Sequence, residues 1–171
     1  GRSAGQKEGA WLLMNAPQLS QSVAYWLEYE RLCGRERLFR ELSLVRPIHD
    51  YLSAVEPATI ELEFPIPNLP AALANQQGKK AIDVCLRRPT GAQAIQDLVE
   101  TKLVRGDRDF TQEIIDDLFR LEWVREPRQR EQFDRWFLIA GEHQDLHDHV
   151  ITNRINPGNR QPRVACFEGI L

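Results

Sequence analysis

Leu98-Val99-Glu100-Thr101-Lys102-Leu103-Val104 is a short run in which a glutamate and a lysine stand two positions apart among aliphatic residues. Alternation with a period of two predicts a β-strand. It places Glu100 and Lys102 on the same face, about 6.6–6.8 Å apart along the strand. Because aliphatic residues flank the triplet on both sides, a central strand is favoured over one at the surface.

A second alternating segment precedes this run and extends from Lys80 to Arg87. Pro89 and Gly91 follow it and are typical of a turn, so the two segments predict a β-hairpin. The two sides of the earlier strand are expected to be Ile82, Val84 and Leu86 on one face, and Ala81, Asp83 and Cys85 on the other.

The hairpin register decides whether two acidic residues meet. A hairpin that is symmetric about Gly91 and Ala92 places Asp83 opposite Glu100, with their Cβ atoms about 4.5–5.5 Å apart. A slip of one residue would send Asp83 to the opposite face. Two carboxylates this close repel each other when both are ionised, unless a cation joins them. Mg²⁺ prefers such oxygen ligands, so the pattern favours a metal site. The alternative is a solvated hairpin face that carries charges without chemistry.

Composition sets limits on the class of protein. With 171 residues and 42% hydrophobic content, the chain fits one folded α/β domain, expected over residues 18–171 after a flexible segment at residues 1–17. The net charge of −3 and a pI near 5.9 argue against a broad surface that coats nucleic acid. Three cysteines without a CxxC pair favour reduced thiols and a cytoplasmic protein, and we expect no membrane span.

Helical spacing dominates the N-terminal part of the chain. A first helix is predicted over residues 20–33, with Gly34 as its stop. A second is predicted over residues 36–55, kinked or split by Pro47. Its buried stripe is expected to be Leu38, Leu42, Val45, Ile48 and Leu52. The next segment predicts a strand over residues 58–64, with Ile60, Leu62 and Phe64 directed inward.

The C-terminal part continues with mixed elements. Asp109 and Gln112 resemble a capping box that opens a helix over residues 110–125. Its apolar stripe is predicted to be Phe110, Ile114, Ile115, Leu118, Phe119 and Leu121 or Trp123. A buried strand is expected over residues 135–141, a short helix over residues 142–150 and a last strand over residues 164–171.

The order of elements around Asp83 and Glu100-Thr101-Lys102 resembles the PD-(D/E)xK, or restriction-endonuclease-like, nuclease superfamily. The resemblance covers roughly residues 36–141. It implies a nuclease-like α/β domain whose mixed four- to five-stranded sheet is flanked by helices and preceded by a helical N-terminal segment. The chain departs from the family where Ile82 replaces the motif's proline. It also lacks the Gln-x-x-x-Tyr signature, because Asp116 stands four residues after Gln112.

The resemblance also implies an activity, namely a metal-dependent endonuclease that hydrolyses phosphodiester bonds, with DNA as the expected substrate. Asp83, Glu100 and the Thr101 carbonyl would hold one or two Mg²⁺ (or Mn²⁺) ions. Lys102 would position the attacking water and offset phosphate charge. Glu41, on a segment similar to the family's helix before the first strand, would complete the metal shell or orient the lysine amine. Glu28 and Glu30 are weaker candidates for that role.

Arg87, Arg105 and Arg108 are candidate contacts to nucleic-acid phosphates, although each could equally be a solvated surface charge. Cutting both strands of a duplex would need two sites, so a homodimer is a further expectation.

Two rival interpretations stay open at this point. His143 and His147 stand four apart and could share a helix face to bind zinc, although no HExxH pattern is present. The chain could also be a nuclease-like fold that is catalytically idle and acts in nucleic-acid or protein binding. A nucleotide-binding enzyme lacks support, because neither GxxxxGK[ST] nor GxGxxG occurs.

Overall fold

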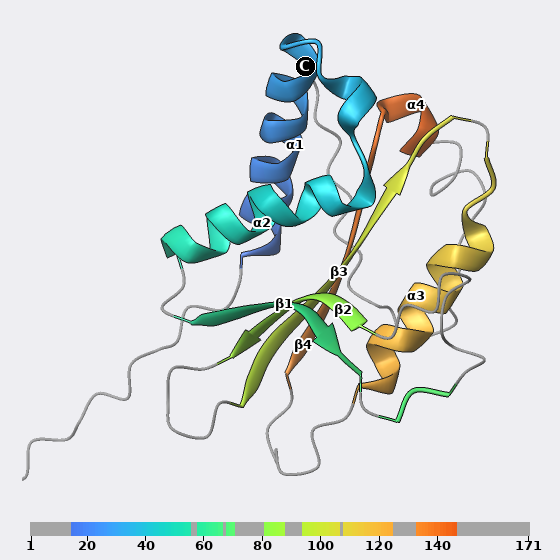
Figure 1. Cartoon of the computed structure of the whole chain (residues 1–171). Coiled ribbons are helices and arrows are strands. Elements are labelled where there is room, and N and C mark those ends of the chain that lie inside the picture. The colour runs from blue at the N-terminus through green and yellow to red at the C-terminus, as the bar shows by residue number, and fades with distance from the viewer. Residues whose placement is uncertain are drawn as a thin grey trace, which may run out of the picture.

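The computed structural model describes residues 15–55, 58–66, 68–70, 81–87, 94–106, 108–124 and 133–146 (Figure 1). In chain order, the elements are α1 (Ala16–Leu32), η1 (Glu36–Leu38), α2 (Glu41–Val55), β1 (Thr59–Pro65), β2 (Ala81–Arg87), β3 (Ile95–Val104), α3 (Thr111–Trp123), β4 (Asp134–Gly141) and α4 (His143–Leu146). The fold is α/β with a four-stranded mixed sheet flanked by helices, which confirms the predicted class at that level.

The strand order in the sheet is β1-β2-β3-β4. The first three strands pair antiparallel, whereas β3 and β4 pair parallel, with α3 lying between them in the chain. A parallel pair needs a long crossover of this kind. Val84 pairs with Val99, as in the predicted symmetric hairpin, but the register shifts by one residue between Leu86 and Arg87, where Arg87 pairs with Ile95. Every residue of β3 is buried, so its predicted central place in the sheet is confirmed.

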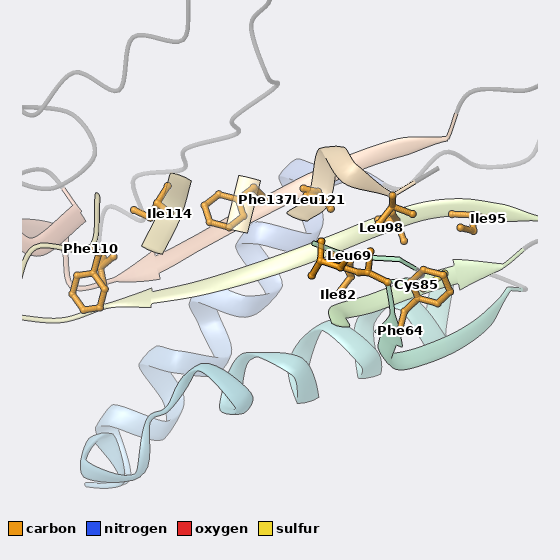
Figure 2. Packing of buried hydrophobic residues seen from close by; sticks show 13 residues of the cluster. Phe64, Leu69, Ile82, Cys85, Ile95, Leu98, Phe110, Ile114, Leu121 and Phe137 are labelled. Atoms are coloured by element: carbon orange, nitrogen blue, oxygen red, sulfur yellow. The ribbon is translucent and has the colours of Figure 1, made fainter. Parts of the chain in front are cut away.

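Two apolar clusters cover the two faces of the sheet. On one face, α1 and α2 contribute Leu19, Val23, Leu44, Ile48 and Leu52, which pack on Val84, Leu86, Val99 and Leu103. On the other face, Ile114 and Leu121 of α3 pack with Leu98 and Phe137 (Figure 2). The view in Figure 1 accordingly shows α1 and α2 on the opposite side of the sheet from α3. Burying each large aliphatic side chain contributes about 1.5–3 kcal/mol.

Helix α2 corrects the prediction of one helix over residues 36–55. A single 3₁₀ turn ends at Leu38, the chain extends at Phe39, and α2 begins at Glu41. The helical stripe therefore runs through Leu44, Ile48 and Leu52, and two predicted core residues are exposed, Leu38 by 68% and Leu42 by 69%. Of the two outcomes predicted at Pro47, a kink or a split, the split does not occur, because Pro47 is buried inside one continuous α2.

Strands β1 and β2 also depart from simple alternation. Leu62, expected to point inward, is 44% exposed, whereas Phe64 is buried. The positive φ of 54° at Glu63 disturbs the period of two at this edge strand. Ile82 packs in the cluster that contains Cys85, and not in the cluster of Val84 and Leu86. The alternation of β2 is thus interrupted around Asp83.

Helix α3 forms close to the predicted range but with a different cap and a different buried face. The N-cap of α3 is Phe110 and not Asp109, whose Oδ1 accepts from the Thr111 N–H at 2.8 Å, so the predicted capping box is wrong. The Gln112 amide donates to Asp116 at 2.8 Å. Phe119 and Trp123 are 58% and 43% exposed, which removes them from the predicted stripe. Charged residues take their place on the buried face.

The remaining boundaries shift by a few residues. Helix α1 begins at Ala16, inside the segment expected to be flexible, with Asn15 Oδ1 accepting from the Gln18 N–H. Strand β4 is less buried than predicted, because it forms an edge of the described sheet. The last predicted strand, residues 164–171, lies outside the described residues. In the part of the chain that the structure describes, no helix combines the length and the apolar character needed to cross a bilayer.

Candidate functional site

Asp83, Glu100 and Thr101 contact one another where the backbone pairing of β2 and β3 ends. The described pairs of this ladder stop at Val84 and Val99. Beyond them, the Asp83 N–H donates to Glu100 Oε2 at 3.1 Å. In return, Asp83 Oδ2 accepts from the Thr101 N–H at 2.8 Å and from the Thr101 hydroxyl at 2.6 Å. Each strand thus offers a carboxylate to the backbone of its neighbour, and both acids are buried.

Lys102 is the next member of the site, and its amine contacts three carboxylates. Nζ lies 2.9 Å from Asp117 Oδ2, 3.2 Å from Glu41 Oε1 and 3.5 Å from Glu113 Oε2. The lysine side chain is only 6% exposed. The structure therefore brings Glu41, which lies far away in the sequence, to the lysine chosen from the β3 pattern.

The position of Glu41 follows from the start of α2. Ser43 links back to Arg40 through both its backbone and its hydroxyl, which closes the first turn of the helix. Glu41 stands in that turn, where the helix dipole favours a negative charge. The other two candidates for this role are engaged on α1, Glu28 with Arg31 and Glu30 with Arg35.

Asp117 and Arg120 of α3 are site residues that the sequence reasoning missed. Arg120 Nη2 lies 3.1 Å from Glu100 Oε1 and also contacts Asp117 Oδ1. Both α3 side chains are almost fully buried. A signal was present in the sequence, because position 117 falls between the buried Ile114 and Leu121 at helical spacing. A charge at such a position is unusual unless it has a partner.

The contacts join into one chain of alternating charge, which runs through Glu100, Arg120, Asp117, Lys102 and Glu41. Burial alone would lower the pKa of Lys102, but the attraction of Asp117 and then of Glu41 outweighs it, so this pKa is raised. Burial raises the pKa of Glu41, and Lys102 offsets only part of that rise. Lys102 therefore stays protonated at neutral pH, while Glu41 ionises less readily than a free glutamate.

The three candidate arginines lie in different places. Arg87 Nε contacts Glu61 at 3.0 Å on the β1–β2 face. It stands four residues from Asp83, which is about 13 Å along a strand. Arg105 donates to the carbonyls of Phe39 and Glu36 at 2.9 and 2.5 Å, so it holds the segment that leads into α2. Arg108 pairs with Glu113 and is 64% exposed, which makes it the candidate arginine linked to the network.

The donor set suits a hard cation, because every acidic group here offers oxygen. Both Glu100 oxygens already have a partner, in Arg120 and the Asp83 N–H, but each carboxylate oxygen carries a second lone pair. Among the described residues, no group of three or more His, Cys, Asp or Glu side chains is arranged to hold a metal ion. For the zinc alternative, His143 begins α4 and His147 lies outside the described residues.

Comparison of the chain with family models, with curated proteins and with solved structures gives no match. The functional assignment therefore depends on the residues and contacts described above.

Proposed function

We propose that the chain is a metal-dependent nuclease with a restriction-endonuclease-like core, which hydrolyses phosphodiester bonds of DNA with Mg²⁺ or Mn²⁺. The observation that carries this proposal is the meeting of Glu41, Asp83, Glu100 and Lys102. These residues come from a helix and two strands, and they form one contact network at the end of the β2–β3 ladder. The acids stand on the second and third strands of the sheet, as the resemblance implies.

Each residue then has a defined task. Asp83, Glu100 and the Thr101 carbonyl would hold the ion, which supplies Lewis-acid polarisation and a more acidic water when bound. Lys102 acts as a fixed positive charge near the phosphate and not as a base, because its pKa is raised. Glu41 orients the lysine amine. Glu41 and Glu113 are the partly exposed members of the network, so substrate approaches from their side.

The test is cleavage of plasmid and linear DNA by the purified chain with Mg²⁺, Mn²⁺ or EDTA. Asp83→Ala and Lys102→Ala should each lower the rate by about 100-fold or more. Asp50→Ala is the matched control, because this aspartate is 66% exposed on α2 and should keep the wild-type rate. Cleavage at an unchanged rate in both site variants would overturn the proposal.

A second candidate is a catalytically idle nuclease-like domain that binds nucleic acid or protein. The observation that favours it is the Arg120–Glu100 ion pair, which already places a protein cation on a proposed metal ligand. The two functions separate in one experiment. Saturable DNA binding with no product, across both metals and across single- and double-stranded substrates, favours the idle domain, whereas metal-dependent product formation excludes it.

A further inference from the structure

Two charged residues on the buried face of α3 need a reason to be there. Asp117 is 2% exposed and Arg120 is 1% exposed. Removing both charges from water costs several kcal/mol per ion, and apolar residues of similar volume are often as stable or more stable at such positions. Stability alone therefore explains this pair poorly. Their contacts point instead to the two charged side chains of the Glu100-Thr101-Lys102 triplet.

Helix α3 holds each end of the triplet with a different residue. Asp117 Oδ2 forms an ion pair with the Lys102 amine at 2.9 Å, without hydrogen-bond geometry, and Arg120 Nη2 donates a hydrogen bond to Glu100 Oε1 at 3.1 Å. Asp117 Oδ1 also contacts Arg120 Nη2, so the two holding contacts are linked. One turn of α3 thus contacts both the glutamate and the lysine, which stand two positions apart on β3.

Arg120 makes these contacts with one nitrogen. Within the part of the chain that the structure describes, its Nε and Nη1 atoms are buried and have no hydrogen-bond partner. The guanidinium fork is therefore not used as a two-pronged clamp on one carboxylate. The contact between Glu100 and Asp117 is therefore made by a single positively charged nitrogen. A lysine ammonium at position 120 could also supply one.

We infer that Asp117 and Arg120 are positioning residues, which set the distance between the Glu100 carboxylate and the Lys102 amine through their mutual contact. This inference rests on the proposed function for its consequence, namely that the spacing serves catalysis. Neither residue is expected to touch the substrate, because both lie beneath the triplet and are closed to solvent.

The first test needs no catalytic activity. The pKa of Lys102 is measured by side-chain NMR in the wild type, in Asp117→Asn and in Glu113→Gln. The charged groups in contact with this amine are Asp117, Glu41 and Glu113. Beyond them, Arg120 contacts Asp117, Arg108 contacts Glu113, and Asp83 acts on Glu41. Asp117→Asn should lower the pKa clearly more than Glu113→Gln, since Glu113 is farther away and partly exposed. An equal or larger effect of Glu113→Gln overturns the inference.

A second pair of variants tests whether Arg120 couples Glu100 and Asp117 to the Lys102 amine. These variants still test the positioning role if Asp117→Asn does not fold. Arg120→Gln removes the cation that competes for Asp117, so the Lys102 pKa should rise. Arg120→Lys keeps a cation there and should leave that pKa near the wild-type value. The same Lys102 pKa in both Arg120 variants would show that the two contacts are independent.

The kinetic test separates positioning from general stability. In metal-dependent cleavage, Asp117→Asn should lower kcat by about 10- to 100-fold with KM for DNA unchanged, the pattern of a displaced catalytic group. Arg120→Lys should recover most of the rate lost in Arg120→Gln. A rise in KM at unchanged kcat contradicts the inference. If the wild type cleaves nothing, the proposed function fails, while the NMR measurements still decide the positioning role.

Discussion

The two sides of Lys102 carry the same kinds of charge in very different surroundings. Toward α3, Asp117, Arg120 and Glu100 are all at most 3% exposed. Toward solvent, Glu41 is 40%, Glu113 32% and Arg108 64% exposed. Water screens the second group and not the first, so contacts of similar length differ strongly in energy.

The buried side and the open side of Lys102 therefore have different roles. The buried side fixes where the lysine and the glutamate stand, because removing any partner leaves a charge without solvent. The open side contributes little to stability and, in the proposed function, is the side from which an ion and a phosphate would enter. Removing a charge from the buried side should therefore lower the free energy of unfolding much more than removing a charge from the open side.

Arg120→Met should have the largest effect on stability. Removing Arg120 leaves the buried Glu100 without its cationic partner and Asp117 with Lys102 alone, and breaking a buried pair in this way costs about 3–5 kcal/mol. Urea unfolding followed by circular dichroism measures the loss. Arg31→Met is the control, since the Arg31–Glu28 pair is a solvent-screened surface contact whose loss should lower stability far less. Equal losses in the two variants would mean that burial does not set the energy of these pairs.

Lys102→Met should lower the free energy of unfolding by about 1.5–3 kcal/mol at neutral pH, because hydrogen bonds to Glu41 and Glu113 and the ion pair with Asp117 are lost. The folded pKa of Lys102 is raised, so its contribution is complete below the unfolded value of about 10.4 and is lost as the pH rises through the higher folded value. Unfolding measured from pH 8 to 12 should show the wild type approaching the variant. A constant gap would contradict the raised pKa.

Glu41→Gln should change stability by less than about 1 kcal/mol, and in the stabilising direction at pH 7. Burial raises the folded pKa of this glutamate, so its ionised form is disfavoured in the folded state, and stability increases as the pH falls through that pKa. The advantage of the variant should therefore shrink between pH 7 and pH 4. If Glu41→Gln clearly lowers the free energy of unfolding at pH 7, Glu41 contributes to stability like the buried residues Asp117, Arg120 and Glu100.

Arg108→Ala should have the smallest effect, within about 0.5 kcal/mol, because its pair with Glu113 is solvent-exposed. Thermal unfolding at low and at high salt checks this expectation. A larger loss that disappears in high salt would indicate that the open side is electrostatically coupled to Lys102.

Local pattern predicted the strands and their register well. The turn formers between β2 and β3 led to the pairing of Val84 with Val99, and the aliphatic flanks of the triplet led to a central β3. Pattern failed where the backbone changes course between elements. Phe39 is extended, so Leu38 and the residues of α2 do not belong to one continuous helix. The predicted stripe is therefore broken, and Leu38 and Leu42 are exposed.

From its amino-acid order alone, this chain specifies the places of the strands, the hairpin register near Val84 and Val99 and the closeness of Asp83 to Glu100, because backbone geometry gives these features a short, fixed period. The partners of Lys102 could not be obtained in that way. Glu41 and Asp117 reach the same amine only when α2 and α3 pack on opposite sides of β3. Distances between segments far apart in sequence depend on how whole helices pack, which no local period encodes.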